Sequence, residues 1–487
     1  MDKVKSKSQP MNQSDNESVI IDVAKPKVHI SLFGAVTFGM GSMIGSGIFI
    51  SPAGTLHNSG SIGMSLIMWT FCGLLSLLFA LVYGELGSLL PHSGGDFSYI
   101  NKSLGRVPAF LVVWTVPLFS NTASLAVLSL VFANYLLAFL FQSCTPSIAM
   151  TKLVAATMVL TLGVTNTWSA KLGAYTQIVC TVVKVTALLL ISLGGIVFLC
   201  QGKVHNFDNS FQGSATDVTS YTLAIYNCMF AYGGFSRIGE IAEEIHNPQR
   251  NIYKAVLISV ISVTFIYVMT NISFFTLLPK ASFLTSSAVA YDWALDGFKP
   301  VAFLVPLCVI VSVYGASNSN SFGSSRILFS AARAGHFPEV MSFLNVNSSV
   351  PVISVMIIHG IALVLLIPGN IGTLINFLNF LIFIMMMLTS ISLLNIRYEQ
   401  RNEPKDGDKF RSPIIVPILS TLFCIFLIVT PFVSSPQVEF LYGIAIVAVG
   451  FFIYIPFVHF ELKVPGIDTV TMIFQLICNI RPVEKSL

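Results

Sequence analysis

The sequence predicts an all-α membrane protein with twelve transmembrane helices, of which the first and the sixth are discontinuous. The composition is the first observation: of the 487 residues, 54% are hydrophobic and only 10% are Asp, Glu, Lys or Arg, whereas soluble domains carry about 25% charged residues. The second observation is a series of apolar stretches long enough to cross a bilayer. The third is that glycines cluster inside two of these stretches.

The candidate spans emerge when hydropathy is averaged over about 19 residues. They cover residues 31–53, 62–90, 108–139, 152–167, 173–200, 218–240, 252–278, 300–330, 351–368, 371–396, 412–433 and 438–460. We therefore expect one membrane domain at residues 30–460, between an amino tail of residues 1–29 and a carboxyl tail of residues 461–487. Because the number of spans is even, both tails are expected on the same side.

Lysine and arginine are unevenly distributed among the connections. Of the 26 Lys and Arg residues, 20 lie in the two tails and the even-numbered connections, and two lie within spans. The other four are Lys152, Lys203, Lys280 and Lys299, in the odd-numbered connections. The positive-inside rule therefore predicts that both tails are cytosolic. The amino tail is polar and lacks the pattern of a cleaved signal peptide.

Glycine clusters interrupt the first and the sixth spans. Residues 41–49 contain three glycines, and residues 230–235 contain two. Such interruptions in corresponding spans indicate inverted repeats, here residues 30–200 and 218–397, with a binding site near the bilayer midplane. The alternative is close helix packing, which small residues also permit. That alternative explains single glycine pairs better than two clusters that are five spans apart.

The chemistry of a broken helix predicts the ligand. An unwound segment exposes backbone amides where a helix restarts, and these bind a carboxylate; the carbonyls where the other helix ends bind an ammonium group. A ligand with both groups on neighbouring atoms is an α-amino acid. We expect its carboxylate at Ser46 and Gly47, and its amine near the carbonyls of Met43, Phe230 and Gly233.

Lys184 is the only charged residue in the fifth span. An ammonium at membrane depth costs at least about 2.5 kcal/mol, and intramembrane charges tend to mark ion or substrate pathways. We therefore predict a functional role for this lysine. The alternative is a structural lysine that pairs with backbone carbonyls inside the bundle.

Several motifs taken together resemble a known family. They are I-G-S-G-I-F-I-S-P at 44–52, F-A-Y-G-G at 230–234, E-E at 243–244, N-P-Q-R-N at 247–251, and the segment from S-R at 325–326 through A-R-A-G-H-F-P at 332–338. The chain is similar, over about residues 30–460, to the light, transporting subunits of the heteromeric amino acid transporters. These belong to the L-type family within the amino acid–polyamine–organocation superfamily. The dibasic/cystine and large-neutral types are the nearest.

The resemblance implies a LeuT-type fold of five-plus-five inverted repeats and roles for individual residues. Ser46 and Gly47 would hold the substrate carboxylate, and Phe230 would be the aromatic gate over the substrate. Lys184 falls where the family keeps a lysine in the position that sodium-driven transporters of this fold give to the ion. The chain would then need no sodium and would exchange substrates by alternating access.

Cys144 points to a partner. Seven of the eight cysteines lie in spans or in the carboxyl tail, whereas Cys144 lies in the external connection between the third and fourth spans. An unpaired external cysteine suggests an intermolecular disulfide, with a free thiol as the alternative. In the family this cysteine binds a single-span glycoprotein, the heavy subunit. The resemblance therefore implies a disulfide-linked heterodimer in the plasma membrane.

Substrate selectivity depends on departures from the family pattern. The dibasic type carries an aspartate where this chain has Gly233, so a cationic side chain would be left without a partner; neutral, large or aromatic side chains fit better. Phe235 replaces the usual tryptophan. Arg237 could select cystine or acidic amino acids if it faces the cavity. It also lies three residues before Glu240, a spacing that permits pairing.

The leading prediction is a sodium-independent exchanger of neutral amino acids. The alternatives are an exchanger or uniporter for cystine and acidic amino acids, and, in another class, a non-transporting membrane receptor or assembly subunit. No zinc-ligand spacing, phosphate-binding loop or Ser/His/Asp arrangement rises above chance. We therefore expect no enzyme activity, no cofactor, no metal and no nucleic-acid partner.

Overall fold

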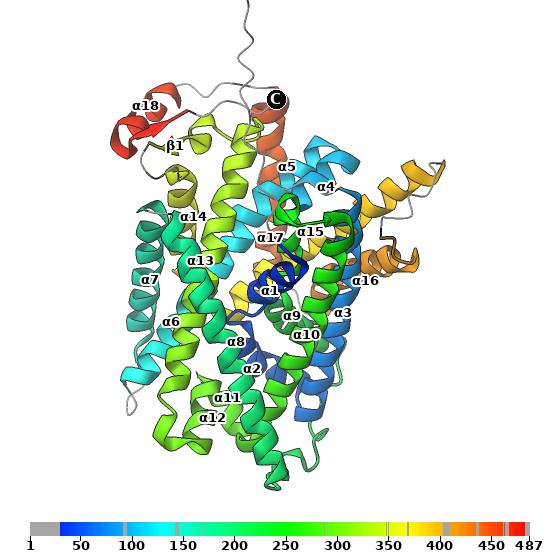
Figure 1. The fold of residues 1–487 in the computed structure, drawn as a ribbon, viewed down its shortest axis with the longest axis vertical. Helices are drawn as coiled ribbons and strands as arrows, with labels where there is room; N and C mark the ends of the chain where they lie inside the picture. The colour runs from blue at the N-terminus through cyan, green and yellow to red at the C-terminus, as the bar shows by residue number, and fades with distance from the viewer. Residues whose placement is uncertain are drawn as a thin grey trace, which may run out of the picture.

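The computed structural model describes residues 30–482, except for 91–94, 142–145, 169, 287, 347, 349, 368–369, 403–409, 435–437, 461 and 463–466. Figure 1 shows a single helical bundle along the long axis of the molecule. Helices occupy all of the predicted spans: α1 (Leu32–Met43) with α2 (Gly47–Ser59), α3 (Ile62–Leu89), α5 (Arg106–Thr115) with η1 (Val116–Ser120) and α6 (Asn121–Leu140), α7 (Ile148–Trp168), α8 (Ala170–Cys200), α9 (Val218–Tyr232) with η3 (Phe235–Glu244), α10 (Pro248–Leu277), α13 (Leu304–Arg333), α14 (Val352–Leu366), α15 (Ile371–Glu399), α16 (Ile415–Ser434), and α17 (Val438–Tyr454) with η7 (Ile455–His459).

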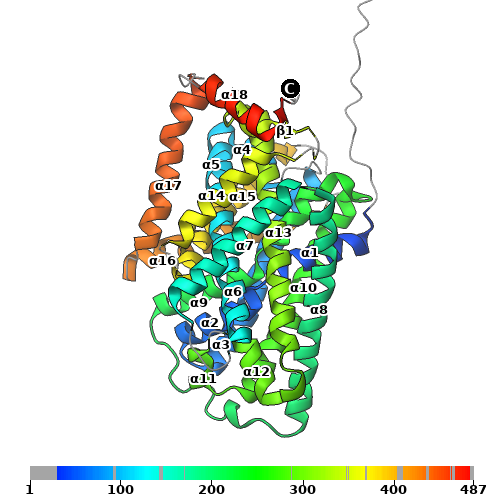
Figure 2. The same cartoon turned by 90° about the vertical axis from the view of Figure 1, so that its left-hand side faces the viewer.

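The remaining elements are short and lie at the two ends of the bundle. Helices α11 (Lys280–Thr285) and α12 (Val289–Gly297) lie at one end, and α4 (Gly95–Leu104) and α18 (Ile467–Cys478) lie at the other (Figure 2). Within the described residues the strands are β1 (Leu344–Asn345) and β2 (Ile480–Arg481), which pair in antiparallel fashion. The remaining described elements are single 3₁₀ turns: η2 (His205–Phe207), η4 (Lys299–Val301), η5 (Glu339–Ser342) and η6 (Gln400–Asn402).

The structure confirms an all-α membrane protein. Eight of the described helices are long and apolar enough to cross a bilayer, and the bent pair α1–α2 adds a ninth. The other predicted spans do not meet this criterion for identifiable reasons. Helix α9 stops after 15 residues, α14 has only 15 residues, and the 30-residue α13 carries polar residues at 317–321. The count of twelve spans therefore stays a prediction.

The packing of the bundle brings the two broken spans together. Helix α2 packs against α9, and α1 packs against α10 and η3. Helix α10 also packs against α3 and α8, and α13 packs against α6 and α8. Helix α8, which carries Lys184, therefore packs against both α10 and α13.

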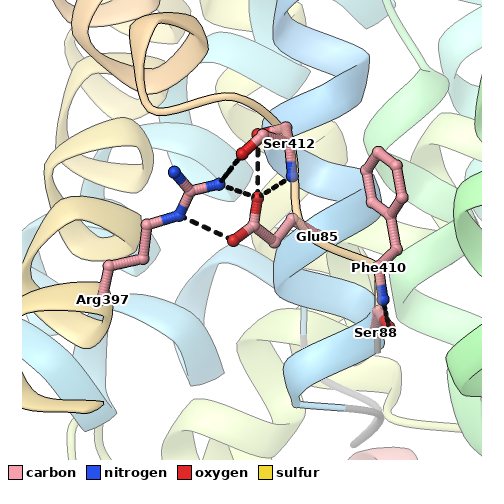
Figure 3. A network of polar contacts seen from close by, with 5 residues as sticks. All are labelled: Glu85, Ser88, Arg397, Phe410 and Ser412. Carbon is pink, nitrogen blue, oxygen red and sulfur yellow. Dashed lines mark hydrogen bonds and ion pairs between the residues drawn. The ribbon is translucent and has the colours of Figure 1, made fainter. Parts of the chain in front are cut away.

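A buried ion pair fastens the end of the bundle that carries α4 and α18. Figure 3 shows Glu85 of α3 facing Arg397, in the last turn of α15. The Glu85 side chain is fully buried and accepts a hydrogen bond of 2.7 Å from Arg397 Nε. Its other oxygen also accepts bonds from Arg397 Nη2 and, at 2.8 Å each, from the backbone amide and hydroxyl of Ser412. Because charges on both sides are paired and hydrogen-bonded, this burial is tolerated.

The segment before α16 is held at a second point. The Ser88 hydroxyl accepts a hydrogen bond of 3.1 Å from the amide of Phe410 and donates one of 2.8 Å to the carbonyl of Gln249. The Phe410 ring stacks on Tyr253 of α10, with centroids 4.4 Å apart. Together with the Glu85–Arg397 ion pair, these contacts connect α3, α10, α15 and the segment before α16 at one end of the molecule.

Candidate functional site

Both predicted helix breaks are present. Helix α1 ends at Met43, and Ile44 is extended, with a ψ of 95°. Helix α2 begins at Gly47, and the two segments bend by 49°. Helix α9 ends at Tyr232, followed by Gly233 with a ψ of 153° and by Gly234 in the left-handed region with a φ of +109°. The chain then continues as a 3₁₀ segment. The regular backbone hydrogen bonding therefore stops in both spans.

Glycines allow the two breaks to touch. A Cβ atom on Gly47 would lie 2.4 Å from Cα of Ala231, and one on Gly234 would lie 2.6 Å from the carbonyl oxygen of Ser42. Any larger residue would force these backbones apart. By contrast, a Cβ atom on Gly45 or Gly233 would meet nothing closer than 3.7 Å and 3.6 Å respectively. The first pair of glycines is needed for contact, whereas a Cβ atom at either glycine of the second pair would make only ordinary van der Waals contacts.

The start of α2 is suited to an anion. The first amides of a helix lack partners within it, and the helix dipole adds positive potential. Ser46 is the N-cap residue of α2; its side chain is 1% exposed, and its hydroxyl has no hydrogen-bond partner among the described residues. A buried hydroxyl without a partner is uncommon in folded proteins. The amides and this hydroxyl can together bind a carboxylate.

The carbonyl side of the site contains a residue that the sequence analysis missed. Tyr267 of α10 is fully buried, and its hydroxyl lies 3.0 Å from the carbonyl oxygen of Met43 and 3.1 Å from that of Ala231. The phenol has one proton and can therefore donate fully to only one of these carbonyls at a time. The other retains capacity for a second donor, such as an ammonium group.

Phe230 and Gly233 lie beside these carbonyls. Phe230 is half-buried in the last turn of α9, and the Phe230 carbonyl oxygen is the atom 3.6 Å from the Cβ position of Gly233. Phe235 is different: its side chain is 1% exposed and packs edge-on against Tyr83 of α3, with centroids 5.6 Å apart. That contact is a packing contact between helices, so the structure gives Phe235 no direct place among the groups around the breaks.

Lys184 points into the protein. Its side chain is 1% exposed, and its ammonium group donates a hydrogen bond to the carbonyl oxygen of Gly41, near the end of α1. A Cβ atom on Gly41 would lie 3.1 Å from the Thr181 side chain, so α1 and α8 are in close contact here. The lysine thus places its charge against the backbone of the first half-helix, two residues before that helix ends.

Arg237 contacts the neighbouring helix α13. Its guanidinium group donates a hydrogen bond of 3.3 Å to Asn320 Oδ1, and Gly323 leaves room for it: a Cβ atom there would lie 2.8 Å from Arg237 Nη1. Asn320 in turn donates a bond of 2.7 Å to the carbonyl oxygen of Asn121 on α6. The side chain of Glu240, the predicted pairing partner, lies outside the described residues.

The polar run on α13 binds helices together. In addition to the contacts of Asn320, the Ser321 hydroxyl lies 3.2 Å from His359 Nε2 on α14 and 3.4 Å from Asn166 Nδ2 on α7.

Cys144 lies outside the described residues, so its predicted disulfide stays a prediction.

Comparison with known proteins identifies the family. The amino acid permease family matches residues 30–477 of the chain. The chain belongs to the amino acid permease family. It is accordingly a multi-pass membrane protein of a transporter family and not an enzyme.

Three relatives illustrate the place of the chain within the permeases. It is 33% identical over 476 residues to mouse "b(0,+)-type amino acid transporter 1", covering 97% of both proteins. It is 34% identical over 466 residues to the human "Cystine/glutamate transporter", covering 95% of the chain and 92% of the relative. It is 32% identical over 459 residues to rat "Large neutral amino acids transporter small subunit 2", covering 93% of the chain and 85% of the relative. The family resemblance inferred from the motifs is confirmed.

Proposed function

We propose that this permease is a sodium-independent exchanger of neutral L-amino acids, especially large or aromatic ones, which works by alternating access. The observation that carries the proposal is the meeting of two helix breaks. At the start of α2 the site presents backbone amides and the Ser46 hydroxyl, which has no hydrogen-bond partner among the described residues. At the ends of α1 and α9 it presents the carbonyls of Met43 and Ala231. An α-amino acid carries a carboxylate and an ammonium group at the spacing that such a pair of sites needs.

Lys184 supports independence from sodium. A buried ammonium group against the Gly41 carbonyl supplies a fixed positive charge beside the broken first helix. A metal ion at the same place would be repelled by this charge and would find the carbonyl already occupied. Without a coupled sodium ion, the transporter can exchange substrates but cannot use a sodium gradient to concentrate them.

The glycine at position 233 supports the choice of neutral substrates. Glycine carries no carboxylate that could pair with a substrate side chain, so a lysine or arginine substrate would bury a charge without compensation. The relatives whose names mention large neutral amino acids, or cystine and glutamate, match almost the whole chain. Neutral amino acids are therefore the first choice, and cystine or acidic ones the second.

Arg237 supports the second candidate function, the exchange or uniport of cystine and acidic amino acids. Its half-buried guanidinium group lies three residues beyond Gly234, where it could attract a carboxylate on a substrate side chain. The hydrogen bond to Asn320 argues for the alternative, a role in joining η3 to α13. We place the neutral exchanger first because Arg237 already has this neighbour.

We further propose that the chain is the light subunit of a heterodimer in the plasma membrane, with both termini in the cytosol. The rat relative is named a small subunit, and Cys144 is available in a connection predicted to be external. The partner is a single-span glycoprotein bound through a disulfide. The end of the bundle that carries α4 and α18 would then face the cytosol.

Counter-transport distinguishes the candidate functions. Proteoliposomes containing the purified transporter are preloaded with unlabelled tyrosine, leucine, glutamate or cystine, and uptake of the labelled amino acid is followed without sodium. The proposal predicts rapid exchange of tyrosine and leucine and little exchange of glutamate. Exchange of glutamate and cystine alone would favour the second function, and uptake that does not depend on preloading would indicate a uniporter.

A further inference from the structure

Helix α18 exposes a row of large apolar side chains. Met472, Ile473, Leu476 and Ile477 are 55%, 47%, 79% and 76% exposed. Residues three and four positions apart lie on the same face of a helix, and these spacings connect all four residues into one continuous surface. Exposed apolar surface of this kind usually marks an interaction site.

The opposite side of α18 is fixed to the protein. Phe474 and Cys478 pack against a small apolar cluster that includes Val340, Phe343 and Ile353. Directly after α18, strand β2 pairs with β1. The helix is therefore held in a definite orientation, and its apolar row is turned away from the bundle.

Hydrogen bonds tie α18 to the end of the span α7. The carbonyl oxygen of Cys478 accepts a bond of 2.9 Å from Asn345 Nδ2, and the hydroxyl of Ser348 donates a bond of 3.2 Å to the carbonyl of Thr167. The next residue, Trp168, ends α7 and is 78% exposed. Tryptophan is enriched at the boundary between lipid and water. The short connection that contains Asn345 and Ser348 is thus bonded both to the end of α18 and to the last turn of α7, where Trp168 lies.

The apolar row also continues the lipid-facing surface of the last span. Phe452 on α17 is 71% exposed, and the exposed apolar residues Phe457, Phe460 and Leu462 follow it toward α18. Four residues of sequence separate Leu462 from the start of α18. Figure 2 shows α18 beginning at the end of α17 and crossing the end of the bundle.

We propose that α18 is an interfacial membrane helix whose apolar row inserts into the lipid bilayer. Helices with one apolar face lie in the plane of the interface, with that face buried about 5–10 Å into the boundary of headgroups and acyl chains. The bilayer is the occupant because the exposed apolar residues of α17 lead along the chain to the row, and because the end of α18 is bonded to the same short connection as Thr167, the neighbour of Trp168. This role is independent of which amino acid is transported.

Photo-crosslinking tests the contact. The photoreactive residue p-benzoylphenylalanine replaces Leu476 in the full-length protein, in membranes that contain clickable phosphatidylcholine. The control position is Arg401, an exposed residue of η6 at the same end of the molecule. We expect a lipid adduct at position 476 several times stronger than at 401. A lipid signal no stronger than the control, or an adduct to another protein alone, would overturn the proposal.

Hydrogen exchange provides a second measurement that does not need the crosslinker. The double variant Leu476→Gln with Ile477→Gln removes two members of the row but keeps the helix-forming character of the segment. In bilayer nanodiscs the amides of α18 should exchange several times faster in this variant than in the native protein. Equal exchange rates in nanodiscs would contradict insertion of this face into lipid.

Discussion

Gly233 defines the space in which a substrate side chain would lie in the proposed site. The groups that would bind the amino acid head are backbone atoms, among them the carbonyls of Met43 and Ala231, and the hydroxyl of Ser46. These groups are the same for every α-amino acid, so selectivity must come from side chains around them. A Cβ atom at Gly233 would have its nearest neighbour 3.6 Å away, an ordinary contact, so a side chain can begin there without a clash.

Replacing Gly233 with aspartate should therefore change the substrate class. A carboxylate at this position can pair with the ammonium or guanidinium group of lysine or arginine, which otherwise would be buried without a partner. We expect Gly233→Asp to raise the uptake of labelled arginine by roughly tenfold, which corresponds to about 1.4 kcal/mol, and to reduce the uptake of tyrosine. Gly233→Asn, which has the same size without the charge, should not admit arginine; equal arginine uptake by both variants would mean that the pocket lies elsewhere.

The sequence predicts the residues of the breaks but not their neighbours. Glycine and the N-cap serine act through the local backbone, so Ser46, Gly47 and Gly233 can be identified from the chain itself. Tyr267 acts through its position between two helices that are distant in sequence, and in the sequence it looks like any packed tyrosine. The contact of Arg237 with Asn320 is likewise a product of packing between η3 and α13.

At the scale of elements, the half-helices of the two broken spans depend on close backbone contact. Gly47→Ala would place a methyl group 2.4 Å from Cα of Ala231, a distance that side chains cannot accommodate without a shift of α2 or α9. Overpacking usually costs about 1–3 kcal/mol, and this site should reach the upper part of that range. We expect a clearly lower thermal midpoint for the purified protein.

Gly45→Ala is the matched control for this prediction. A Cβ atom at Gly45 would meet nothing closer than the Cβ of Ala316, at 3.7 Å, which is an ordinary contact. Its thermal midpoint should stay close to that of the native protein. If Gly45→Ala were as destabilising as Gly47→Ala, the close approach of the two half-helices would not be the cause.

The ion pair of Glu85 and Arg397 should contribute strongly to stability. Glu85→Gln removes the charge but keeps the shape, and it leaves a guanidinium group that is only 14% exposed without its carboxylate. Breaking one side of a buried pair costs about 3–5 kcal/mol. We expect a large fall in the thermal midpoint measured in detergent.

Ser412→Ala is the comparison for the ion pair. It removes the serine hydroxyl that donates a hydrogen bond to the Glu85 carboxylate, and should lower the free energy of unfolding by only about 1 kcal/mol. A Glu85→Gln variant as stable as Ser412→Ala would show that the network is not a major fastening between α3, α15 and the segment before α16.

The helices and the breaks were predictable because their signals are local. Apolar stretches give the spans, and glycine clusters give the interruptions. The orientation of α18 was not predictable, because it depends on β1 pairing with β2 and on the cluster around Phe343. Such contacts join segments more than a hundred residues apart.

For the whole molecule, assembly with a heavy subunit is the prediction that is simplest to test. Cys144→Ser should eliminate a species of higher mass that reducing agents dissociate, because it removes the thiol that we propose forms the disulfide. Non-reducing gel electrophoresis of membranes from cells that express the chain and its partner measures this directly. Cys200→Ser is a suitable control, since Cys200 is an exposed cysteine at the end of α8. Persistence of the band in Cys144→Ser would contradict the linkage.

The central claim is that an amino acid binds between the two helix breaks while the charge of Lys184 makes sodium unnecessary. The most direct test is counter-transport of labelled tyrosine in proteoliposomes, in sodium and in choline medium, for the native protein and for Lys184→Ala. We expect equal exchange by the native protein in both media, and a loss of roughly tenfold or more in the variant. A native protein that requires sodium, or a variant that exchanges tyrosine at the full rate in choline, would contradict it.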